Sequence, residues 1–421
     1  MGGSVPDIPG TKANHDLAAS FRYEVANLLK RKQTSFPGAQ PVSFASKHLD
    51  ELQREDYYVC EKTDGIRCLM YLTEDQGQEV VYLIDRKNDF YHVLNLHFPL
   101  EGDNPEAFHT QTILDGELVN ETQQDGSFKM QYLVFDCLVM DGNILTHRTL
   151  DKRLAYFREK LFFPYKTLYK QFPEEIKFLP FTMHFKQVEF SYAIQKMFEE
   201  VIPNLKHGSD GLIFTCRNSP YTSGTDDHIL KWKMETENSI DFRMHLQFPI
   251  VEPDSDDEGG SYPDYTVLPR INLTCFGGEE GDIPYGEMTI TVAEWDMMKA
   301  QNRPLDERVV ECYLDKMGKW RFLRFRDDKK ESNHKSTVES VMESIRDGVT
   351  QKDLINKQAR IKDEWKQRQA ALEQPRRDQE ARKPNIAATQ QGMTSLSNGE
   401  AVNGSSGIKK EIEESECLPQ E

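Results

Sequence analysis

A lysine, an Asp-Gly turn and an arginine follow one another directly after an apolar run. Lys62 comes after Tyr57–Cys60, and Asp64 and Gly65 separate it from Arg67. A lysine amine is nucleophilic only when it is neutral, and its ordinary pKa of about 10.4 leaves almost none in that form at physiological pH. Nearby cations and partial burial lower this pKa, so the pattern favours a covalent catalyst, with Arg67 also placed to contact phosphate. An exposed lysine before an ordinary hairpin turn has the same sequence, and this segment alone does not decide between the two.

Acidic residues stand inside or beside several apolar runs further along the chain. Asp115 and Glu117 lie within Thr112–Val119, and Asp210 comes directly before Gly211–Cys216. A buried carboxylate is costly without a partner, so these acids are candidates for a polar site. Turns with exposed acids are the alternative at each position.

Two basic stretches have the spacing of phosphate-binding strands. Lys231 and Lys233 alternate in a short apolar run, which places both ammonium groups on one strand face. Residues 316–330 contain seven basic and two acidic residues, a local charge of +5 in a chain of net charge −18. Arg324 and Arg326 alternate there with aromatic residues, a pattern typical of phosphate or single-stranded nucleic-acid binding. A solvated strand face and an edge strand blunted by charge are the respective alternatives.

The elements that must position these residues form two blocks. In the first, apolar spacing predicts helices over 15–32, 151–163 and 187–201, and strands at 57–60, 67–72, 80–85, 112–119, 131–139, 211–216 and 228–233. This order predicts an antiparallel-rich α+β domain. In the second block, the runs 242–248, 270–276, 288–292, 308–313 and 320–325 suit a small β-barrel such as an OB fold, although an arbitrary β-domain would look the same.

Composition sets the limits of this organisation. With 421 residues, two or three domains are expected, and 38% apolar against 29% charged residues is a soluble globular composition. The sequence has no run long enough for a membrane span and no secretory signal at its beginning. Seven scattered cysteines without a C-x-x-C pair predict a protein of a reducing, intracellular compartment. Net acidity describes the whole surface, so it does not exclude a basic groove.

The order of the motifs resembles the covalent nucleotidyltransferase superfamily, which contains capping guanylyltransferases and ATP-dependent ligases. The segments in question are K-T-D-G-I-R, L-D-G-E-L-V, Y-L-V-F-D-C-L, D-G-L-I-F, L-K-W-K and L-R-F-R-D-D-K. The segments F-P-G-A-Q-P-V-S-F, I-D-R-K-N-D-F-Y and V-V-E-C-Y are similar to the capping branch in its fungal form. The likeness extends from about residue 15 to about residue 365, and six motifs in order are far more specific than any one of them.

The resemblance implies a fold and a division of the chain. The fold is an antiparallel-rich α+β nucleotidyltransferase domain of the ligase and capping type, ATP-grasp-like, followed by an OB-fold β-barrel. The expected domains are the nucleotidyltransferase domain (15–237), the OB-fold domain (238–330) and a helical segment packing back on the first domain (331–370). Composition predicts disorder at both ends: residues 1–14 have little to bury, and residues 371–421 contain no Phe, Tyr or Trp.

The resemblance also implies a reaction. The chain would transfer GMP from GTP, through a lysyl-N6-GMP intermediate on Lys62, to the 5′-diphosphate end of nascent pre-mRNA, giving GpppN. A divalent metal, Mg²⁺ or Mn²⁺, would assist, and its ligands cannot be named from the sequence.

Further residue roles follow from the same resemblance. Arg67 would hold the α-phosphate region, and Asp210 would help to place the metal. The remaining expected GTP contacts are a ribose pair (Arg86, Glu117), a guanine sandwich (Phe135, Ile213), a guanine-reading lysine (Lys186), phosphate-binding lysines (Lys231, Lys233) and an OB-domain group that meets the β- and γ-phosphates on closure (Arg324, Arg326, Asp328, Lys329).

Several expectations concern partners and competing functions. The sequence has no phosphatase signature and no methyltransferase loop, so the chain is expected to perform only the transfer step. The resemblance then implies a separate RNA 5′-triphosphatase (beta) subunit in a heterodimer, the phosphorylated C-terminal domain of RNA polymerase II, the nascent mRNA 5′ end and a nuclear location. An ATP-dependent nucleic-acid ligase is the alternative enzyme, and a non-catalytic OB-type RNA-binding or scaffold protein is the alternative of another class.

Overall fold

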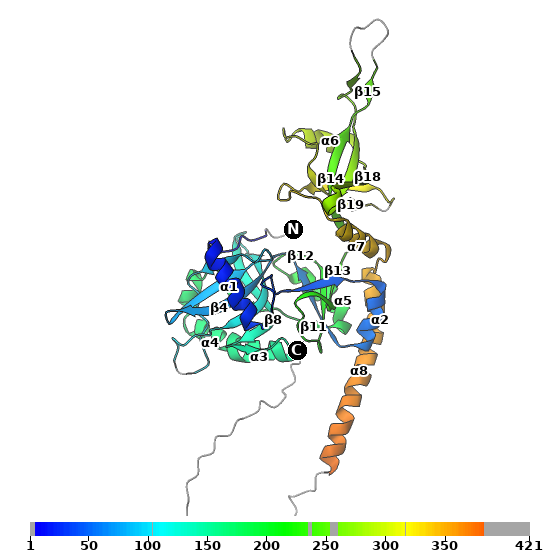
Figure 1. Ribbon diagram of the computed structural model, residues 1–421. Helices are drawn as coiled ribbons and strands as arrows, with labels where there is room; N and C mark the ends of the chain where they lie inside the picture. Colours follow the sequence, from blue (N-terminus) through cyan, green and yellow to red (C-terminus); the bar gives the residue numbers. More distant parts are fainter. Residues whose placement is uncertain (1–4, 103, 235–237, 253–259, 316, 383–421) are drawn as a thin grey trace, which may run out of the picture.

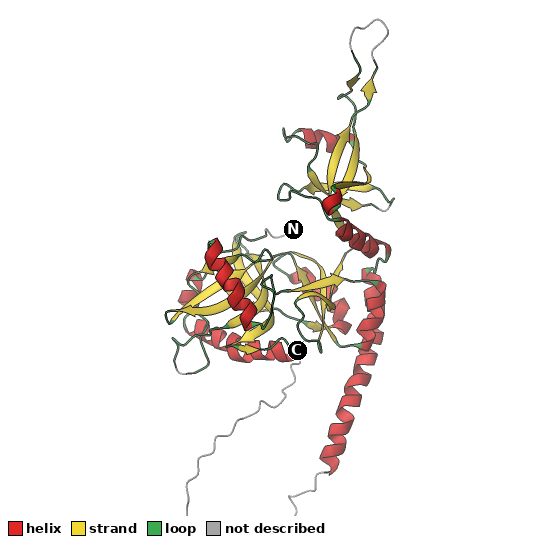
Figure 2. Cartoon of the chain, viewed as in Figure 1, coloured by secondary structure: helices red, strands yellow, loops and turns green. Residues whose placement is uncertain are grey.

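The computed structural model describes residues 5–102, 104–234, 238–252, 260–315 and 317–382. Two β-sheets and their helices form the main body, a closed β-barrel stands beyond it, and the long helix α8 runs along the side of the body (Figure 1). Figure 2 shows that strands make up the centre of the body and that helices lie outside them. Within the described ranges, none of the helices has the length and hydropathy that crossing a bilayer requires.

An eight-stranded sheet forms half of the body, in the order β1-β6-β5-β4-β7-β8-β10 with β9 beside β8. Its pairs are antiparallel except β8 with β10. Alternation along β4 sends Leu69 and Tyr71 toward α1 (His15–Leu28), and Met70 to the opposite face. The strands are β1 (Thr11–Lys12), β4 (Ile66–Asp75), β5 (Gln78–Ile84), β6 (Phe90–Val93), β7 (Thr112–Thr122), β8 (Phe128–Met140), β9 (Asn143–Ile144) and β10 (Thr182–Phe185).

A five-stranded sheet forms the other half, in the order β11-β3-β12-β13-β2. Its apolar face, which includes Val59, Phe214 and Trp232, packs on α2 (Ser46–Arg54), α5 (Ile194–Lys196) and α8 (Gln351–Arg382). The strands are β2 (Ala39–Ser43), β3 (Tyr57–Thr63), β11 (Glu189–Phe190), β12 (Ser209–Cys216) and β13 (Gly224–Lys233). The opposite face of this sheet is directed to the eight-stranded sheet, and the candidate site lies between the two.

Short helical segments connect the strands of the body. Phe157, Leu161 and Tyr165 pack on the eight-stranded sheet from three consecutive segments, which is why that region reads as helical in the sequence. The segments are α3 (Leu150–Phe157), η1 (Arg158–Phe162), α4 (Phe163–Gln171), η2 (Pro173–Phe178), η3 (Ser191–Ala193), η4 (Met197–Val201) and η5 (Ile202–Asn204). The single helix expected over 187–201 is therefore wrong, because β11 occupies its start and three short segments share the rest.

The second block forms a closed barrel in the order β14-β17-β18-β20-β19. Phe242, Trp320 and Cys312 lie in its core. The barrel strands are β14 (Ser239–Gln247), β17 (Arg270–Phe276), β18 (Asp282–Met288), β19 (Val309–Leu314) and β20 (Trp320–Phe325). Two short helices flank β18: η7 (Gly278–Glu280) precedes it and α6 (Val292–Lys299) follows it. A separate two-stranded sheet pairs β15 (Ile250–Val251) with β16 (Tyr262–Pro263). The strand expected over 288–292 is wrong, because β18 ends at Met288 and α6 begins at Val292.

Two helices connect the barrel to the body. Val338 of α7 (Lys335–Arg346) lies in the barrel core, whereas Leu354 and Ile361 of α8 lie in the core of the body. The joint between them is fixed to the body, because Trp232 Nε1 donates to the Val349 carbonyl at 2.7 Å. Asp347 also accepts hydrogen bonds from the backbone N–H and hydroxyl of Ser46 at 2.9 and 2.7 Å.

Both expected disordered ends need correction where the structure describes them. Gly10 has φ +101°, which turns the chain so that Thr11 and Lys12 pair with β6 as β1. Lys12 then forms an ion pair with Asp89 at 2.7 Å, so residues 5–14 are not loose. At the other end α8 continues to Arg382, beyond the expected boundary at 371, because the segment is rich in good helix formers. Residues 1–4 and 383–421 lie outside the described part.

Candidate active site

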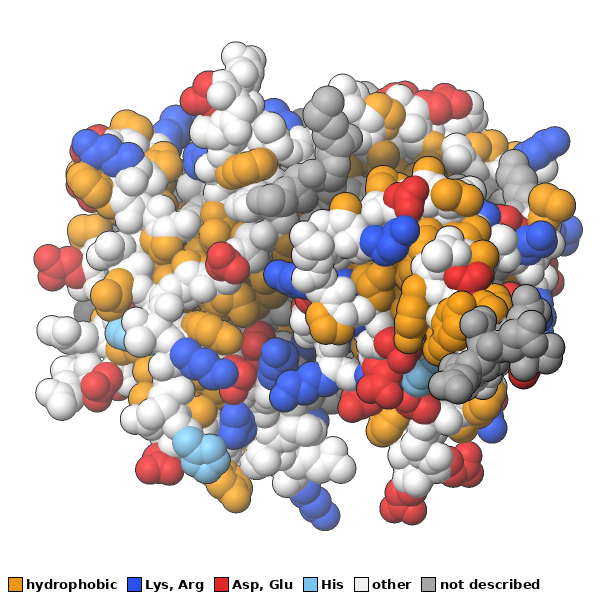
Figure 3. Space-filling model, turned by 90° about the horizontal axis from the view of Figure 1, so that it is seen from above, with side chains coloured by type: hydrophobic (Ala, Val, Ile, Leu, Met, Phe, Trp, Pro, Cys, Tyr) orange, Lys and Arg blue, Asp and Glu red, His pale blue; other side chains and the backbone are white. Residues whose placement is uncertain are grey.

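A cavity of about 350 Å³ lies between the two sheets and is lined by both. Its lining is strongly charged, with six cationic side chains (Lys62, Arg67, Arg86, Lys186, Lys231, Lys233) and three acidic ones (Asp115, Glu117, Asp136). Charged groups of both signs are also interspersed on the face of the molecule seen from above (Figure 3). The cavity is therefore a local concentration of positive charge in a chain of net charge −18, which suits a polyanionic ligand.

The predicted nucleophile lies at one wall of this cavity. Lys62 stands on β3, and its Nζ donates to Asp210 Oδ1 at 2.6 Å. The other oxygen of Asp210 is 3.2 Å from Lys233 Nζ, so one carboxylate connects two ammonium groups. Asp210 reaches this position because the pairing of β12 with β3 is irregular between Ser209 and Leu212.

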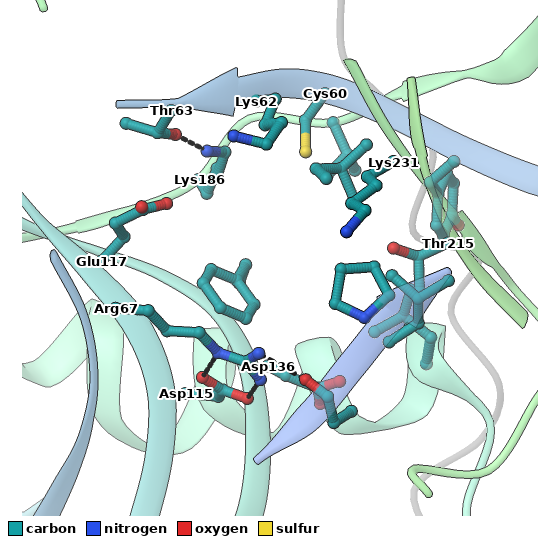
Figure 4. A pocket seen from close by; sticks show the side chains of 18 of the residues that line it. Cys60, Lys62, Thr63, Arg67, Asp115, Glu117, Asp136, Lys186, Thr215 and Lys231 are labelled. Atoms are coloured by element: carbon teal, nitrogen blue, oxygen red, sulfur yellow. Dashed lines mark hydrogen bonds and ion pairs between the residues drawn. The ribbon is translucent and has the colours of Figure 1, made fainter. Parts of the chain in front are cut away.

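Strand alternation delivers the other lysines of this wall. Lys231 and Lys233 on β13 face the cavity with Ile229, while Leu230 and Trp232 between them pack in the core. Burial lowers the pKa of Lys231, and the neighbouring Lys233 and Lys62 lower it further. Lys231 is thus an ammonium whose proton is held less tightly than usual, with its charge aimed into the cavity (Figure 4).

Lys186 is the most enclosed lysine of the cavity. It follows β10, its side chain is 4% exposed, and its ammonium donates to Thr63 Oγ1 and lies 3.4 Å from Glu61 Oε1. Burial lowers its pKa, but Glu61, Cys60 and Glu117 outweigh that effect, so the net shift is upward. The ammonium therefore keeps its proton although it is out of contact with solvent.

Arg67 lines the cavity but is not directed at Lys62. Its guanidinium donates to both oxygens of Asp115, at 3.0 and 2.6 Å, and also to the Ala39 carbonyl. Asp115 accepts in addition from the Tyr221 hydroxyl at 2.6 Å. In Figure 4 Arg67 and Asp115 lie across the cavity from Lys62. This arrangement therefore does not support the expected contact of Arg67 with the α-phosphate, because its guanidinium is already bound by the buried carboxylate of Asp115.

The remaining predicted contacts on the body also line the cavity. Arg86 and Glu117 come from the eight-stranded sheet, and Phe135 and Ile213 come from different sheets. Burial raises the pKa of the Glu117 carboxyl, although Lys186 and Lys62 oppose it. The Arg67 guanidinium lies 5.5 Å from the centre of the Phe135 ring, which steadies that ring at the cavity floor.

The predicted barrel residues do not line this cavity. Arg326 forms a two-oxygen pair with Asp241 at 2.9 and 3.0 Å and another with Asp328 at 2.9 and 2.8 Å. Lys329 also donates to Asp241, and Arg324 donates to Glu311 at 2.6 Å. In this conformation the barrel cations are thus paired with carboxylates of the barrel itself.

Several cavity residues were not identified as site residues from the sequence. Tyr221 and Asp136 belong to buried polar networks, and Asp136 pairs through both oxygens with Arg153 of α3 at 2.7 Å each. Thr63, directly after the nucleophile, could have been found as a polar residue at the strand end. Nothing in the sequence joins Tyr221 to Asp115, because 106 positions separate them.

Cys60 also lines the cavity, two positions before Lys62 on the same strand face. Burial raises the pKa of its thiol to about 12. The thiol is therefore neutral at physiological pH and does not compete with Lys62 as a nucleophile.

The side chains of the cavity suit a divalent cation held mainly by substrate phosphates better than one held entirely by protein ligands. The described residues contain no group of three or more His, Cys, Asp or Glu side chains placed to hold a metal. Asp210 is a carboxylate beside the nucleophile, and Mg²⁺ is commonly held by one or two carboxylates together with substrate phosphates. A lysine nucleophile among cations, with Asp210 beside it, is an arrangement that can perform phosphoryl transfer.

Two family models match the chain in succession. The model described as mRNA capping enzyme, catalytic domain, matches residues 4–235. The model described as mRNA capping enzyme, C-terminal domain, matches residues 237–355. The boundary between them falls between β13 and β14, where the body ends and the barrel begins.

Curated relatives match over most of their length. The mRNA-capping enzyme subunit alpha of Neurospora crassa is 52% identical over 384 residues, which cover 86% of this chain and 95% of the relative. The protein of the same name from Schizosaccharomyces pombe is 41% identical over 413 residues, which cover 97% of this chain and 96% of the relative. That from Saccharomyces cerevisiae is 36% identical over 406 residues, covering 87% and 88%.

Proposed function

This chain belongs to the mRNA capping enzyme family, and from that premise we propose that Lys62 carries its guanylyltransferase reaction. The product of that reaction is the GpppN cap, formed from GTP and the 5′-diphosphate end of nascent pre-mRNA. The observation that supports the role of Lys62 is its position: Nζ lies 2.6 Å from Asp210 at the wall of a cavity with six cationic side chains.

The reaction has two displacements at the same phosphorus atom. In the first, the neutral Lys62 amine attacks the α-phosphorus of GTP, the bond to the bridging oxygen breaks, and pyrophosphate leaves. In the second, a β-phosphate oxygen of the RNA end attacks the lysyl-GMP phosphorus, the P–N bond breaks, and the amine is released. The ammonium proton of Lys62 must leave to solvent before the first attack, and Asp210 Oδ1, which accepts the hydrogen bond from Nζ, orients the amine.

The other cavity residues divide between the phosphates and the nucleoside. Lys231 and Lys233 stabilise the charge that develops as pyrophosphate departs. The nucleoside contacts remain those expected from the resemblance: Arg86 and Glu117 at the ribose, Phe135 and Ile213 at the two faces of guanine, and Lys186 at its edge. Arg67 acts through Asp115 and Phe135 to hold the cavity floor, and we no longer assign it to the α-phosphate.

A divalent cation, Mg²⁺ or Mn²⁺, fits this site when GTP brings its phosphates. Asp210 would hold it from the protein side, in exchange for its contact with Lys62 or Lys233. When bound, such a cation supplies positive charge to the phosphate oxygens.

We assign the barrel to the OB fold, which is supported by its closed strand order β14-β17-β18-β20-β19 and by α6 between the third and fourth strands. We keep the domain boundary at 237/238, extend the first domain at its start to include β1, and extend the helical connection to the end of α8 at Arg382. Closure of the barrel over the cavity would bring Arg324, Arg326, Asp328 and Lys329 to the β- and γ-phosphates.

The relatives are named alpha subunits, which supports a second subunit in a complex. We propose that this subunit is an RNA 5′-triphosphatase, because the 5′-diphosphate substrate must be made from a triphosphate end. The phosphorylated C-terminal domain of RNA polymerase II and a nuclear location remain proposals that follow from a substrate emerging during transcription.

Label transfer tests the central assignment. The protein is incubated with Mg²⁺ and GTP or ATP labelled at the α-phosphate and is then run on a denaturing gel. We expect a strongly labelled band with GTP, at most a trace with ATP, and none with GTP for Lys62→Ala. Lys47→Ala, at an exposed lysine of α2, is the matched control and should label like the wild type.

The alternatives predict different bands. Labelling of Lys62 by ATP in place of GTP would make the chain a ligase-type adenylyltransferase. A folded protein that no nucleotide labels would exclude both enzymes and favour a binding role. Undiminished labelling of Lys62→Ala would assign the nucleophile elsewhere.

A further inference from the structure

A cluster of buried ionisable groups lies behind the nucleophile. Glu61, Lys186 and His207 have side chains exposed by 8% or less. Glu61 is the residue directly before Lys62 on β3, but it is not among the residues that line the cavity. Its carboxylate contacts a cavity residue at Lys186, whose ammonium lies 3.4 Å from Glu61 Oε1.

The donors of Lys186 are divided among defined partners. An ammonium has three N–H donors and no acceptor. One is given to Thr63 Oγ1 and one is directed to Glu61, which leaves the third for whatever occupies the cavity. His207 Nε2 lies 3.8 Å from the same oxygen of Glu61.

The charge of Glu61 also decides the protonation of Lys186. Burial favours the neutral amine, and Glu61 is the first of the groups that restore the charged form, before Cys60 and Glu117. Glu117 and Lys62 are the other labelled charged groups near Lys186 in this part of the cavity (Figure 4). Glu117 is the other carboxylate among the main groups that favour the charged form of Lys186.

We propose that Glu61 is a positioning residue that fixes the Lys186 ammonium and so sets the preference for a 6-oxo purine over a 6-amino purine. The inference rests on the proposed contact of Lys186 with guanine. An ammonium can only donate, so it binds the O6 acceptor of guanine and opposes the 6-amino donor of adenine. A neutral amine has a lone pair and would accept from adenine.

The test is purine selectivity in labelling of Lys62, measured as kcat/KM for GTP, ITP and ATP with Glu61→Gln. ITP is a 6-oxo purine without the 2-amino group, so it isolates the contact at position 6. We expect kcat/KM for GTP and ITP to fall together by about tenfold or more, mainly through KM, while that for ATP is unchanged or rises. The ratio of the variant's kcat/KM to that of the wild type should fall further between about pH 7 and about pH 9, because more of Lys186 becomes the neutral amine in the variant, while any alkaline weakening common to both proteins cancels in the ratio.

Two further variants separate a positioning role from a structural one. Glu61→Asp keeps the charge at a greater distance and should recover part of the selectivity. Glu74→Gln, at an exposed glutamate of β4, is the matched control and should behave as the wild type. If Glu61→Gln does not fold, a selectivity of Glu61→Asp equal to the wild type would count against the proposal.

The measured selectivities decide whether Glu61 positions Lys186. Equal losses for GTP, ITP and ATP, or no loss at all, would overturn the role of Glu61. Lys186→Met distinguishes a failure of this inference from a failure of the proposed function. If Lys186→Met abolishes the preference for GTP over ATP and Glu61→Gln does not, only the inference about Glu61 fails. If Lys186→Met leaves selectivity intact, the guanine contact itself is wrong.

Discussion

The lysines of the cavity differ in their neighbours, and these neighbours decide what each can do. Lys62 and Lys233 share the carboxylate of Asp210, and Lys186 is held by Glu61 and Thr63. Lys231 lies among cations: burial lowers its pKa first, and Lys233, Lys62 and Arg86 add to the effect. One face of the five-stranded sheet therefore supplies the nucleophile from β3 and, from β13, phosphate-binding lysines of which Lys231 is sensitive to pH.

The lowered pKa of Lys231 predicts a pH-dependent affinity for GTP. Because its ammonium loses its proton at a lower pH than an ordinary lysine, the dissociation constant of GTP should rise on the alkaline side of neutrality. Lys231→Arg keeps its charge there and should flatten that rise, since a guanidinium does not titrate in this range. The measurement is equilibrium binding of GTP in a Lys62→Ala background, which cannot react. Profiles that coincide with and without the Lys231→Arg substitution would contradict the assignment.

The Arg67–Asp115 pair predicts a large effect on stability. Asp115→Asn leaves a buried guanidinium without its countercharge, so the free energy of unfolding should fall by about 3–5 kcal/mol. Tyr221→Phe removes the hydroxyl that donates to the same carboxylate and accepts from the buried Ala39 N–H, and it should cost about 2 kcal/mol. Denaturant titration followed by circular dichroism measures both. Equal losses for the two variants would show that the charge pair is not the dominant contribution.

At the scale of elements, the local patterns were informative and the pairings were not. The alternation of Lys231 and Lys233 around a buried Trp232 placed both lysines correctly on one face of β13. α6 was missed although its capping box, Thr291 with Glu294, is visible as T-V-A-E in the sequence. The irregular pairing that brings Asp210 to Lys62 depends on two strands 148 positions apart, and no local signal specifies such a register.

The packing of α8 predicts which part of that helix stabilises the body. Ile361 is 1% exposed in the core shared with the five-stranded sheet, whereas Leu372 on the same helix is 67% exposed. Ile361→Ala should lower the free energy of unfolding by about 2–5 kcal/mol, because it leaves a cavity in that core. Leu372→Ala should change it by less than about 0.5 kcal/mol. Comparable changes for the two variants, measured by denaturant titration, would mean that the helix does not pack on the body in solution.

At the scale of the whole molecule, the cations divide between two bodies. Lys62, Lys231 and Lys233 line the cavity, whereas Arg326 and Lys329 are bound to Asp241 within the barrel. The two bodies are connected by α7, anchored in the barrel, and α8, anchored on the body. Transfer of these cations to a triphosphate would leave the largely buried Asp241 carboxylate without them, so the proposed closure is favourable only when the ligand's phosphates replace that pairing.

This division predicts that a barrel cation matters only when the β- and γ-phosphates are present. Arg326→Ala should slow labelling of Lys62 by GTP by about a hundredfold, since one charged donor to the departing pyrophosphate is lost. Its affinity for GMP, which lacks those phosphates, should stay within about twofold of the wild type, because closure contributes nothing to that complex. Arg270→Ala, at an exposed barrel arginine paired with Glu287, is the matched control and should leave both quantities unchanged. If Arg326→Ala weakens GMP binding as much as it slows labelling, Arg326 would contribute to binding of the nucleoside monophosphate. The barrel would then have to contact GMP without any closure driven by the triphosphate.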